Sequence, residues 1–306
     1  MQTILGAGGA IGTLLARELV PYTNAIRLVS RNPEKVNPGD EIFAADITDP
    51  EAVEKAIEGS KVVYLTAGFE YKTKTWQETW PLVMTSVING CKKHGSRLVF
   101  FDNAYSYDPR YLSNLTEETP LNPPSKKGKV RMQIAQQLLQ ETENGNLTAM
   151  IVRAADFYGP KVNTSIMMET VYKRLKAGKK PMWMGNAKCI HSMTFTPDAA
   201  KATALLGNKP DAFQQVWHLP TSAEKISGKA WIGLFANAMH KEPAFSATPG
   251  WIIKTIGLLN PFFKELGEMM YQFENDYYFN SDKFRQHFPD FKITEAKEGV
   301  EAVVNS

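Results

Sequence analysis

Residues 6–12 read Gly-Ala-Gly-Gly-Ala-Ile-Gly, and this short run decides the fold of a 306-residue chain. Residues 3–5, Thr-Ile-Leu, come just before it and predict a short strand. Residues 11–20, just after it, place apolar side chains at helical spacing and predict a helix. A glycine-rich turn that joins a strand to a helix is typical of α/β domains that begin with a β-α-β unit.

Three glycines of this turn have separate structural tasks. Gly6 permits the tight turn out of the strand, Gly9 lets a ligand approach the backbone, and Gly12 lets the helix pack close to the sheet. The free N–H groups and partial positive charge of a helix N-terminus attract phosphates. The run therefore predicts a site for the pyrophosphate of a dinucleotide. The alternative is a glycine-rich turn that binds no ligand.

The first half of the chain continues to alternate between strand and helix patterns. Strands are expected at residues 25–29, 41–45, 61–66, 97–101 and 148–152, and helices at 50–59, 80–95 and 129–144. This alternation favours a parallel sheet covered by helices on both faces. The fold class predicted is therefore α/β, a Rossmann-type doubly wound parallel sheet.

The second half is less regular and predicts a smaller, mainly helical C-terminal region that acts as substrate domain or lid. Expected elements are helices at 167–177 and 197–207, an extended segment at 192–196 and a strand at 216–219. We expect residues 1–160 plus about 190–220 to form the dinucleotide-binding domain. Residues from about 161 to 189 plus 221–306 are expected to form the substrate or lid domain.

Composition excludes several classes of protein. Apolar residues make up 43% of the chain, charged residues 22%, and the formal net charge is only +3, which gives no sign of a nucleic-acid partner. Cys91 and Cys189 are far apart and outside any Cys-x-x-Cys pattern, so neither a disulfide nor a metal site is expected. The N-terminus leaves no room for a signal peptide, and residues 251–263 are too short and interrupted to span a bilayer. We expect a cytoplasmic protein with no membrane partner.

The end of the second expected strand indicates which dinucleotide is bound. It reads Leu28-Val29-Ser30-Arg31 and lacks the carboxylate that accepts a hydrogen bond from the ribose 2′-hydroxyl in NAD sites. The guanidinium of Arg31 can pair with a 2′-phosphate instead. The sequence therefore favours NADP over NAD. Arg31 could alternatively be an exposed loop residue, with the cofactor chosen elsewhere.

Several further segments occur in an order that resembles a known family. They are Ala45-Asp46-Ile47, Val63-Tyr64-Leu65-Thr66-Ala67-Gly68, Arg153-Ala154-Ala155-Asp156-Phe157-Tyr158-Gly159-Pro160 and residues 191–202. With the glycine run, they resemble the extended short-chain dehydrogenase/reductase superfamily of epimerase- and dehydratase-like proteins over roughly residues 1–220. The resemblance implies cofactor contacts at Gly6, Gly8, Gly9, Ala10, Ile11, Gly12, Ser30, Arg31, Asp46, Ile47, Thr66, Ala67, Gly68 and Arg131.

The resemblance fails at the catalytic residues. Such enzymes use a Tyr-x-x-x-Lys pair, in which the tyrosine exchanges a proton with the substrate and the lysine holds the nicotinamide ribose. Here the tyrosine position falls on Lys127 and the lysine position on Arg131, while Trp80 takes the place of an asparagine. Arg131 could hold the ribose but cannot exchange a proton. Lys127 could act as an acid if desolvated, yet its lysine neighbours favour an exposed loop. A Tyr-x-x-x-Lys at 172–176 looks like a chance match.

Other polar residues are candidates for the missing proton chemistry. Asp102 and Asn103 follow a strand end, where they could polarise a substrate or simply form an Asx-turn. Tyr105 could replace the tyrosine as acid or only pack. Asp156 stands where the family carries a substrate-contacting asparagine, so a carboxylate there would disfavour sugar nucleotides and could act as a base. Asp156 could instead cap a turn. His191 could face the substrate or have only a structural role.

Two functions remain open from the sequence. The first is an NADP(H)-binding oxidoreductase or epimerase-like enzyme that acts on a small carbonyl or hydroxyl substrate with an atypical catalytic site. The alternative is a non-catalytic NADP(H)-binding redox sensor or regulator. The resemblance also implies a possible homodimer through the helices expected at 80–95 and 129–144.

Overall fold

The computed structural model describes residues 1–162 and 165–306. The chain divides into two compact units, each built from three segments. The first contains residues 1–106, 127–153 and 199–219, and the second contains residues 107–126, 154–198 and 220–306. Segments 107–126, 154–160 and 190–198 thus lie in the second unit and not, as expected, in the dinucleotide-binding domain.

The first unit is built on a seven-stranded sheet whose paired strands run parallel. Its strands are β1 (Gln2–Leu5), β2 (Ile26–Ser30), β3 (Glu41–Ala44), β4 (Val62–Leu65), β5 (Arg97–Asn103), β6 (Ala149–Ala154) and β10 (Val216–His218). Their spatial order is β10-β6-β5-β4-β1-β2-β3, so the direction of winding reverses between β1 and β4. This confirms the predicted doubly wound α/β sheet, whose ligands bind outside the carboxyl ends of the strands at such a switch point.

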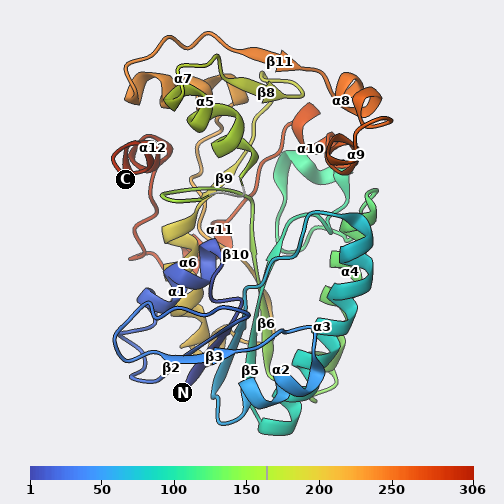
Figure 1. Ribbon diagram of the computed structural model, residues 1–306, viewed down its shortest axis with the longest axis vertical. Helices are drawn as coiled ribbons and strands as arrows, with labels where there is room; N and C mark the ends of the chain where they lie inside the picture. Colours follow the sequence, from blue (N-terminus) through green and yellow to red (C-terminus); the bar gives the residue numbers. More distant parts are fainter. Residues whose placement is uncertain (163–164) are drawn as a thin grey trace. The chain divides into compact units, whose positions relative to one another are not determined.

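Helices cover both faces of this sheet, with α2, α3 and α4 on one face and α1 and α6 on the other (Figure 1). Their bounds are α1 (Ala10–Glu18), α2 (Pro50–Ile57), α3 (Thr73–His94), α4 (Lys126–Glu143) and α6 (Thr196–Gly207). The apolar faces of α2, α3 and α4 close over the strands in one continuous core. Burying these faces is the main source of stability of the unit.

Two helices begin earlier than predicted, and both differences matter for the site. α3 begins at Thr73 and not at residue 80, because Pro81 lies inside the helix and is not its first residue. The proline leaves the carbonyl of the exposed Gln77 without its helical partner, and water can satisfy that group. α4 begins at Lys126 and not at residue 129, which brings Lys127 into its first turn.

The second unit combines two small sheets with short helices. In the sheets, β7 (Asp156–Tyr158) pairs with β9 (Met193–Phe195), and β8 (Met182–Met184) pairs with β11 (Ser246–Thr248). The helices are a π-helical turn (Met168–Tyr172), α5 (Lys173–Lys176), α7 (Gly228–Ala238), α8 (Gly250–Ile256), α9 (Pro261–Gly267), α10 (Tyr271–Glu274), α11 (Asp282–His287) and α12 (Ala296–Val304). Because β7 and β9 pair with each other and not with the large sheet, the residues around them belong to this unit.

Within the part of the chain that the structure describes, no helix has the length and apolar character needed to cross a bilayer. The same residues contain no cluster of three histidine, cysteine or acidic side chains that could hold a metal ion.

Candidate functional site

The glycine turn after β1 is built so that two of its glycines cannot carry a side chain. Gly6 has a φ of 99°, and a Cβ atom on it would lie 2.5 Å from the Cα atom of Ala67. A Cβ atom on Gly12 would lie 2.5 Å from the carbonyl oxygen of Gly6. A Cβ atom on Gly8 would meet nothing within 4 Å. The backbone is therefore closely packed behind the turn and open in front of it.

The open side of the turn exposes the N-terminus of α1. The N-cap residue Gly9 has no side chain to cap the helix, and the first turn contains no acidic residue. The backbone N–H groups of Gly6 and Ala7 donate to the carbonyl oxygen of Val29, which fixes the turn against β2 before any ligand binds. A preformed turn with uncapped helix N–H groups fits the pyrophosphate of a dinucleotide.

The end of β2 bears no carboxylate, as the sequence indicated. Ser30 is partly buried and Arg31 is exposed immediately after it. The nearby carboxylate of Asp46 accepts hydrogen bonds from the backbone N–H and hydroxyl of Thr48, at 2.9 and 2.8 Å. These hydrogen bonds lower the pKa of Asp46, and the charge of Arg31 adds to the effect. Arg31 is thus close enough to Asp46, another predicted cofactor contact, to affect its pKa, and it is exposed to solvent.

The remaining predicted cofactor contacts gather near the same turn. The backbone N–H of Thr66 donates to the carbonyl of Leu5 at 2.9 Å, which places Ala67 against Gly6. A Cβ atom on Gly68 would meet nothing within 4 Å, so this position is open. Ile47 is buried in the core under α2 and cannot offer more than its backbone and the edge of its side chain.

Lys127 is not in an exposed loop, and that prediction is wrong. Its side chain is fully buried in the first turn of α4. The ammonium lies 4.5 Å from the centre of the Tyr71 ring and 3.4 Å from the Thr73 hydroxyl. An aromatic face and a hydroxyl are both favourable contacts for a buried ammonium group. The lysine neighbours misled the prediction because burial depends on the early start of the helix.

Arg131 lies one turn further along α4 and is part of a buried ion triad. Its Nε and Nη2 atoms donate to Oδ1 of Asp102 at 2.7 and 2.5 Å. Arg153 donates to the other carboxylate oxygen, Oδ2, at 3.0 Å. The three side chains are at most 4% exposed, and the Arg131 guanidinium also stacks 4.3 Å from the Trp80 ring. Asp102 therefore neutralises arginines in the core, and each of its carboxylate oxygens is engaged by one of them.

The Asx-turn expected at the end of β5 is made by Asn103. Its Oδ1 atom accepts a hydrogen bond from the backbone N–H of Tyr105 at 3.0 Å. This turn presents the Tyr105 ring parallel to Trp76, with ring centres 6.2 Å apart. The Tyr105 hydroxyl lies 3.5 Å from that of Tyr71. Tyr105 thus shares an aromatic cluster with the ring that covers the Lys127 ammonium.

Three aromatic residues of this cluster, Phe69, Tyr71 and Trp76, could not be assigned to a site from the sequence. Phe69, Tyr71, Trp76 and Trp80 come from the loop after β4 and the start of α3, and they contact one another edge to face. The spacing of Trp76 and Trp80, four residues apart, was the available signal. It went unused because the helix was expected to begin only at Trp80.

In the second unit, the two candidates that the sequence left separate are partners. Nε2 of His191 lies 2.9 Å from Oδ2 of Asp156, the first residue of β7. His191 is buried, with its ring stacked 4.5 Å from that of Phe273 and 4.9 Å from that of Tyr277. The Asp156 side chain is 25% exposed. Burial raises the pKa of Tyr277, and the negative charge of Asp156 raises it further. A buried histidine therefore orients a carboxylate that solvent can reach.

The Tyr-x-x-x-Lys match at 172–176 lies on the π-helical turn and α5 of the second unit. The Lys176 ammonium is 3.5 Å from the Tyr172 hydroxyl, and the lysine side chain is exposed. Lys176 is therefore a surface residue with none of the burial that Lys127 has.

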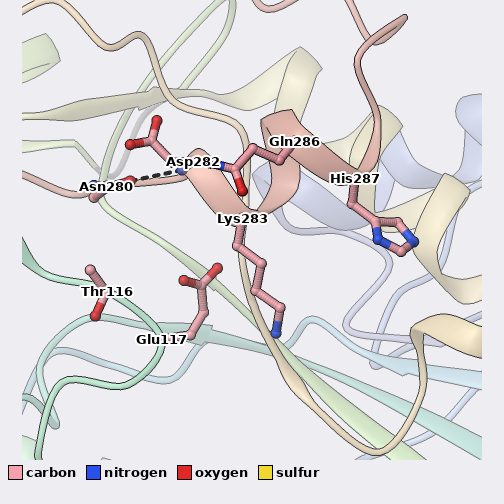
Figure 2. A pocket seen from close by; sticks show the side chains of 7 residues that line it. All are labelled: Thr116, Glu117, Asn280, Asp282, Lys283, Gln286 and His287. Carbon is pink, nitrogen blue, oxygen red and sulfur yellow. Dashed lines mark hydrogen bonds between the residues drawn. The ribbon is translucent and has the colours of Figure 1, made fainter.

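A polar hollow of about 430 Å³ also lies in the second unit (Figure 2). Its lining residues are Thr116, Glu117, Asn280, Asp282, Lys283, Gln286 and His287. Burial lowers the pKa of Lys283, while the charges of Glu117 and Glu118 act in the opposite direction. The hollow contains both signs of charge and none of the residues that the sequence predicted.

Comparison with known proteins agrees with this geometry. The model of a family described as "NAD dependent epimerase/dehydratase family" matches residues 3–219. A curated relative, the uncharacterized protein y4nL of Sinorhizobium fredii (strain NBRC 101917 / NGR234), is 26% identical over 204 residues. That match covers 64% of this chain and 55% of the relative, so the chain spans about half the length of the relative.

Solved structures show the same fold over nearly the whole chain. The Bordetella bronchiseptica enzyme WbmH in complex with NAD+ has a TM-score of 0.76 at 20% identity, covering 99% of this chain and 97% of its own. UDP-glucose 4-epimerase of Thermus thermophilus in complex with NAD has a TM-score of 0.77 at 17% identity, covering 100% and 98%. The Streptomyces venezuelae dTDP-glucose 4,6-dehydratase DesIV, with NAD and TYD bound, has a TM-score of 0.80 at 14% identity, covering 100% and 96%. At these identities the similarity establishes the fold.

Proposed function

This chain belongs to the NAD dependent epimerase/dehydratase family, and we propose that it is an NADP(H)-dependent oxidoreductase or epimerase-like enzyme with an atypical proton donor. The single observation that carries the proposal is the preformed glycine turn, which leaves the N-terminus of α1 open where Gly6 and Gly12 cannot carry side chains. A bound nicotinamide would accept or donate a hydride, and residues 6–12 would hold its pyrophosphate.

The preference for NADP rests on the end of β2. The solved relatives named above hold NAD, whereas this chain has Ser30 and an exposed Arg31 at that position. A guanidinium can form charge-assisted hydrogen bonds to a 2′-phosphate that it cannot form to a hydroxyl. We therefore assign the 2′-phosphate to Arg31.

Calorimetric titration with NADPH, NADH and their oxidised forms tests this assignment. Arg31→Ala should weaken NADPH binding by about 10- to 100-fold, the value of one or two charge-assisted hydrogen bonds, and leave NADH binding unchanged. Arg17→Ala is the matched control, because Arg17 is an exposed arginine in the last turn of α1. Equal binding of NADPH by Arg31→Ala would refute the assignment, and a lack of binding by all four nucleotides would refute the cofactor.

We assign the role of proton donor to Lys127. As hydride reaches the carbonyl carbon of a substrate, the Lys127 ammonium would give one proton to the carbonyl oxygen, and the products would be an alcohol and a neutral amine. The amine would then regain its proton from water. Its fixed position in the first turn of α4, beside the Tyr71 ring and the Thr73 hydroxyl, supports this role.

The substrate class that we propose is a small carbonyl or hydroxyl compound without a nucleoside diphosphate. Asp156 presents a carboxylate to solvent, and like charges repel a diphosphate.

Single-turnover oxidation of NADPH across a panel of small aldehydes and ketones tests the chemistry. Lys127→Met keeps the length and apolar stem of the side chain and should abolish turnover while NADPH still binds. Tyr105→Phe removes only a hydroxyl and should keep most of the rate. If Tyr105→Phe abolishes the rate and Lys127→Met retains it, the proton donor is Tyr105.

A second candidate function is a non-catalytic NADP(H) sensor. One observation favours it: Arg131, at the position of the ribose-holding lysine, is engaged by Asp102 in the core. A sensor would bind the oxidised and reduced cofactors with different affinities and show no turnover with any substrate of the panel. Substrate-dependent hydride transfer would exclude it.

We also propose a cytoplasmic homodimer. Cys91 and Cys189 are free thiols, as a reducing compartment permits. α3 exposes Leu82 on the face turned away from the core, which suits a helix pair between two copies. Light scattering of the purified chain and of Leu82→Glu measures this directly.

A further inference from the structure

A helical hairpin in the second unit exposes more bulky apolar surface than any other segment that the structure describes. It consists of α8, a turn at residues 257–260 and α9 (Figure 1). Trp251 is 68% exposed, Leu258 83% and Leu259 93%. Single exposed leucines are ordinary, but adjacent leucines at the tip of a hairpin beside an exposed tryptophan mark an interaction surface.

The hairpin is firmly attached by its inner face. Ile253 of α8 and Leu266 of α9 are both buried in the unit. The two helices meet closely at Gly257, where a Cβ atom would lie 3.0 Å from the Cα atom of Lys264. The exposed side chains are therefore held in place by an apolar base and do not belong to a loose loop.

The backbone N–H groups of the tip are bonded within the hairpin. The N–H groups of Leu258 and Leu259 donate to the carbonyls of Thr255 and Ile256, at 3.1 and 3.0 Å. The N–H group of Asn260 also donates to Ile256, at 3.0 Å. A tip whose N–H groups are internally bonded can enter an apolar medium without leaving those groups unsatisfied.

The exposed charged side chains of the hairpin are lysines, and its one carboxylate, Glu265, is only partly exposed. Between residues 243 and 264 the chain contains no acidic residue and only two basic ones, Lys254 and Lys264, which are both exposed. Nearby carboxylates are occupied by backbone groups: Glu274 accepts from the N–H of Gly250, and Glu268 accepts from that of Lys126. The surface thus offers an apolar tip between exposed cations.

We propose that the α8–α9 hairpin docks this protein on the surface of an anionic lipid bilayer. Leucines would insert at the level of the acyl chains, the tryptophan would lie in the headgroup region, and the two lysines would meet lipid phosphates. A second copy of the chain suits this surface less well, because a few side chains at a pointed tip cannot supply the about 800 Å² per partner of a standard protein interface. Docking on a bilayer departs from the expectation of no membrane partner. That expectation rested on the lack of a segment able to cross the bilayer, and a docked hairpin does not cross it.

Co-sedimentation of the full chain with vesicles tests the proposal. The wild-type protein should pellet with vesicles of phosphatidylcholine and phosphatidylglycerol and much less with phosphatidylcholine alone. Leu258→Glu/Leu259→Glu should lower the partition coefficient by roughly 100-fold, because burial of each leucine is worth about one factor of ten. Lys254→Gln/Lys264→Gln should lower it by about fivefold per lysine, only on anionic vesicles.

Val20→Glu is the control, since Val20 is a 50% exposed apolar residue of the other unit and should leave vesicle binding unchanged. Wild-type protein that stays in the supernatant with anionic vesicles would overturn the proposal, as would a leucine double variant that pellets like wild type. Light scattering decides the remaining case: if the leucine double variant turns a dimer into a monomer, the surface binds a second copy and not lipid. NADPH binding by every variant should remain that of wild type.

Discussion

Asp102→Asn tests how much the buried ion triad of the first unit contributes to the free energy of unfolding. In the native chain, one carboxylate faces two guanidinium groups, and all three side chains are at most 4% exposed. The amide keeps the shape but removes the negative charge, so Arg131 and Arg153 become buried cations that have lost this counter-charge. Breaking a buried ion pair in this way costs about 3–5 kcal/mol. With two arginines affected, we expect the upper part of that range.

Urea unfolding followed by circular dichroism measures this loss as a change in the free energy of unfolding. Asp282→Asn is the matched control, because it breaks an ion pair to Arg285 whose partners are about half exposed, and such pairs are worth under about 1 kcal/mol. Arg131→Met gives a sharper comparison: it leaves one carboxylate facing Arg153 and should cost less than Asp102→Asn. A loss for Asp102→Asn no larger than that of the control, or smaller than that of Arg131→Met, would refute the charge argument.

Three other predictions follow from packing and titration. Gly12→Ala should weaken NADPH binding at least tenfold and destabilise the fold by about 1–3 kcal/mol, because its Cβ atom would lie 2.5 Å from a backbone oxygen, whereas Gly8→Ala should leave stability unchanged; calorimetry and urea unfolding measure both. A thiol reagent should label only Cys189 in the folded chain and Cys91 only after unfolding, since burial raises the pKa of both thiols but Cys91 is fully buried; labelling of both in the native state would contradict this. Lys283→Met should raise the free energy of unfolding slightly at neutral pH, because burial lowers the pKa of Lys283 in the folded state and so penalises its charged form. This gain should disappear as the pH rises through the pKa of the folded state toward that of the unfolded state. A gain that persists at high pH would contradict this explanation.

The large sheet could be predicted because each of its strands is specified by residues that are adjacent in the sequence. Buried parallel strands are continuous apolar runs, and the glycine turn specifies its own strand and helix. The Asx-turn of Asn103 was one of two alternatives that the sequence left open, since such a turn needs only the residues next to it. The predicted cofactor contacts likewise rest on local backbone geometry, chiefly that of the glycine turn.

Burial and long-range pairing lay outside what the sequence could show. Asp102 meets Arg131 and Arg153, which are 29 and 51 residues away, and no local pattern marks that meeting. Lys127 was expected in a loop because its neighbours are lysines, yet the helix starts early enough to turn it into the core. His191 and Asp156 were weighed singly, because their pairing depends on how β7 and β9 lie side by side.

Lys127 and Arg131 of α4 and Asp102 of β5 are best considered together, as one set of buried charges. Lys127 and Arg131 are four residues apart, so they lie on the same face of α4, and both are buried. Two cations on one buried helix face need compensation, and Asp102 at the end of β5 supplies a carboxylate directly to Arg131. An arginine held in this way does not titrate, so it fixes a charge and exchanges no proton. If proton chemistry takes place on this face of the helix, Lys127 is the group available for it, because Arg131 is held by Asp102.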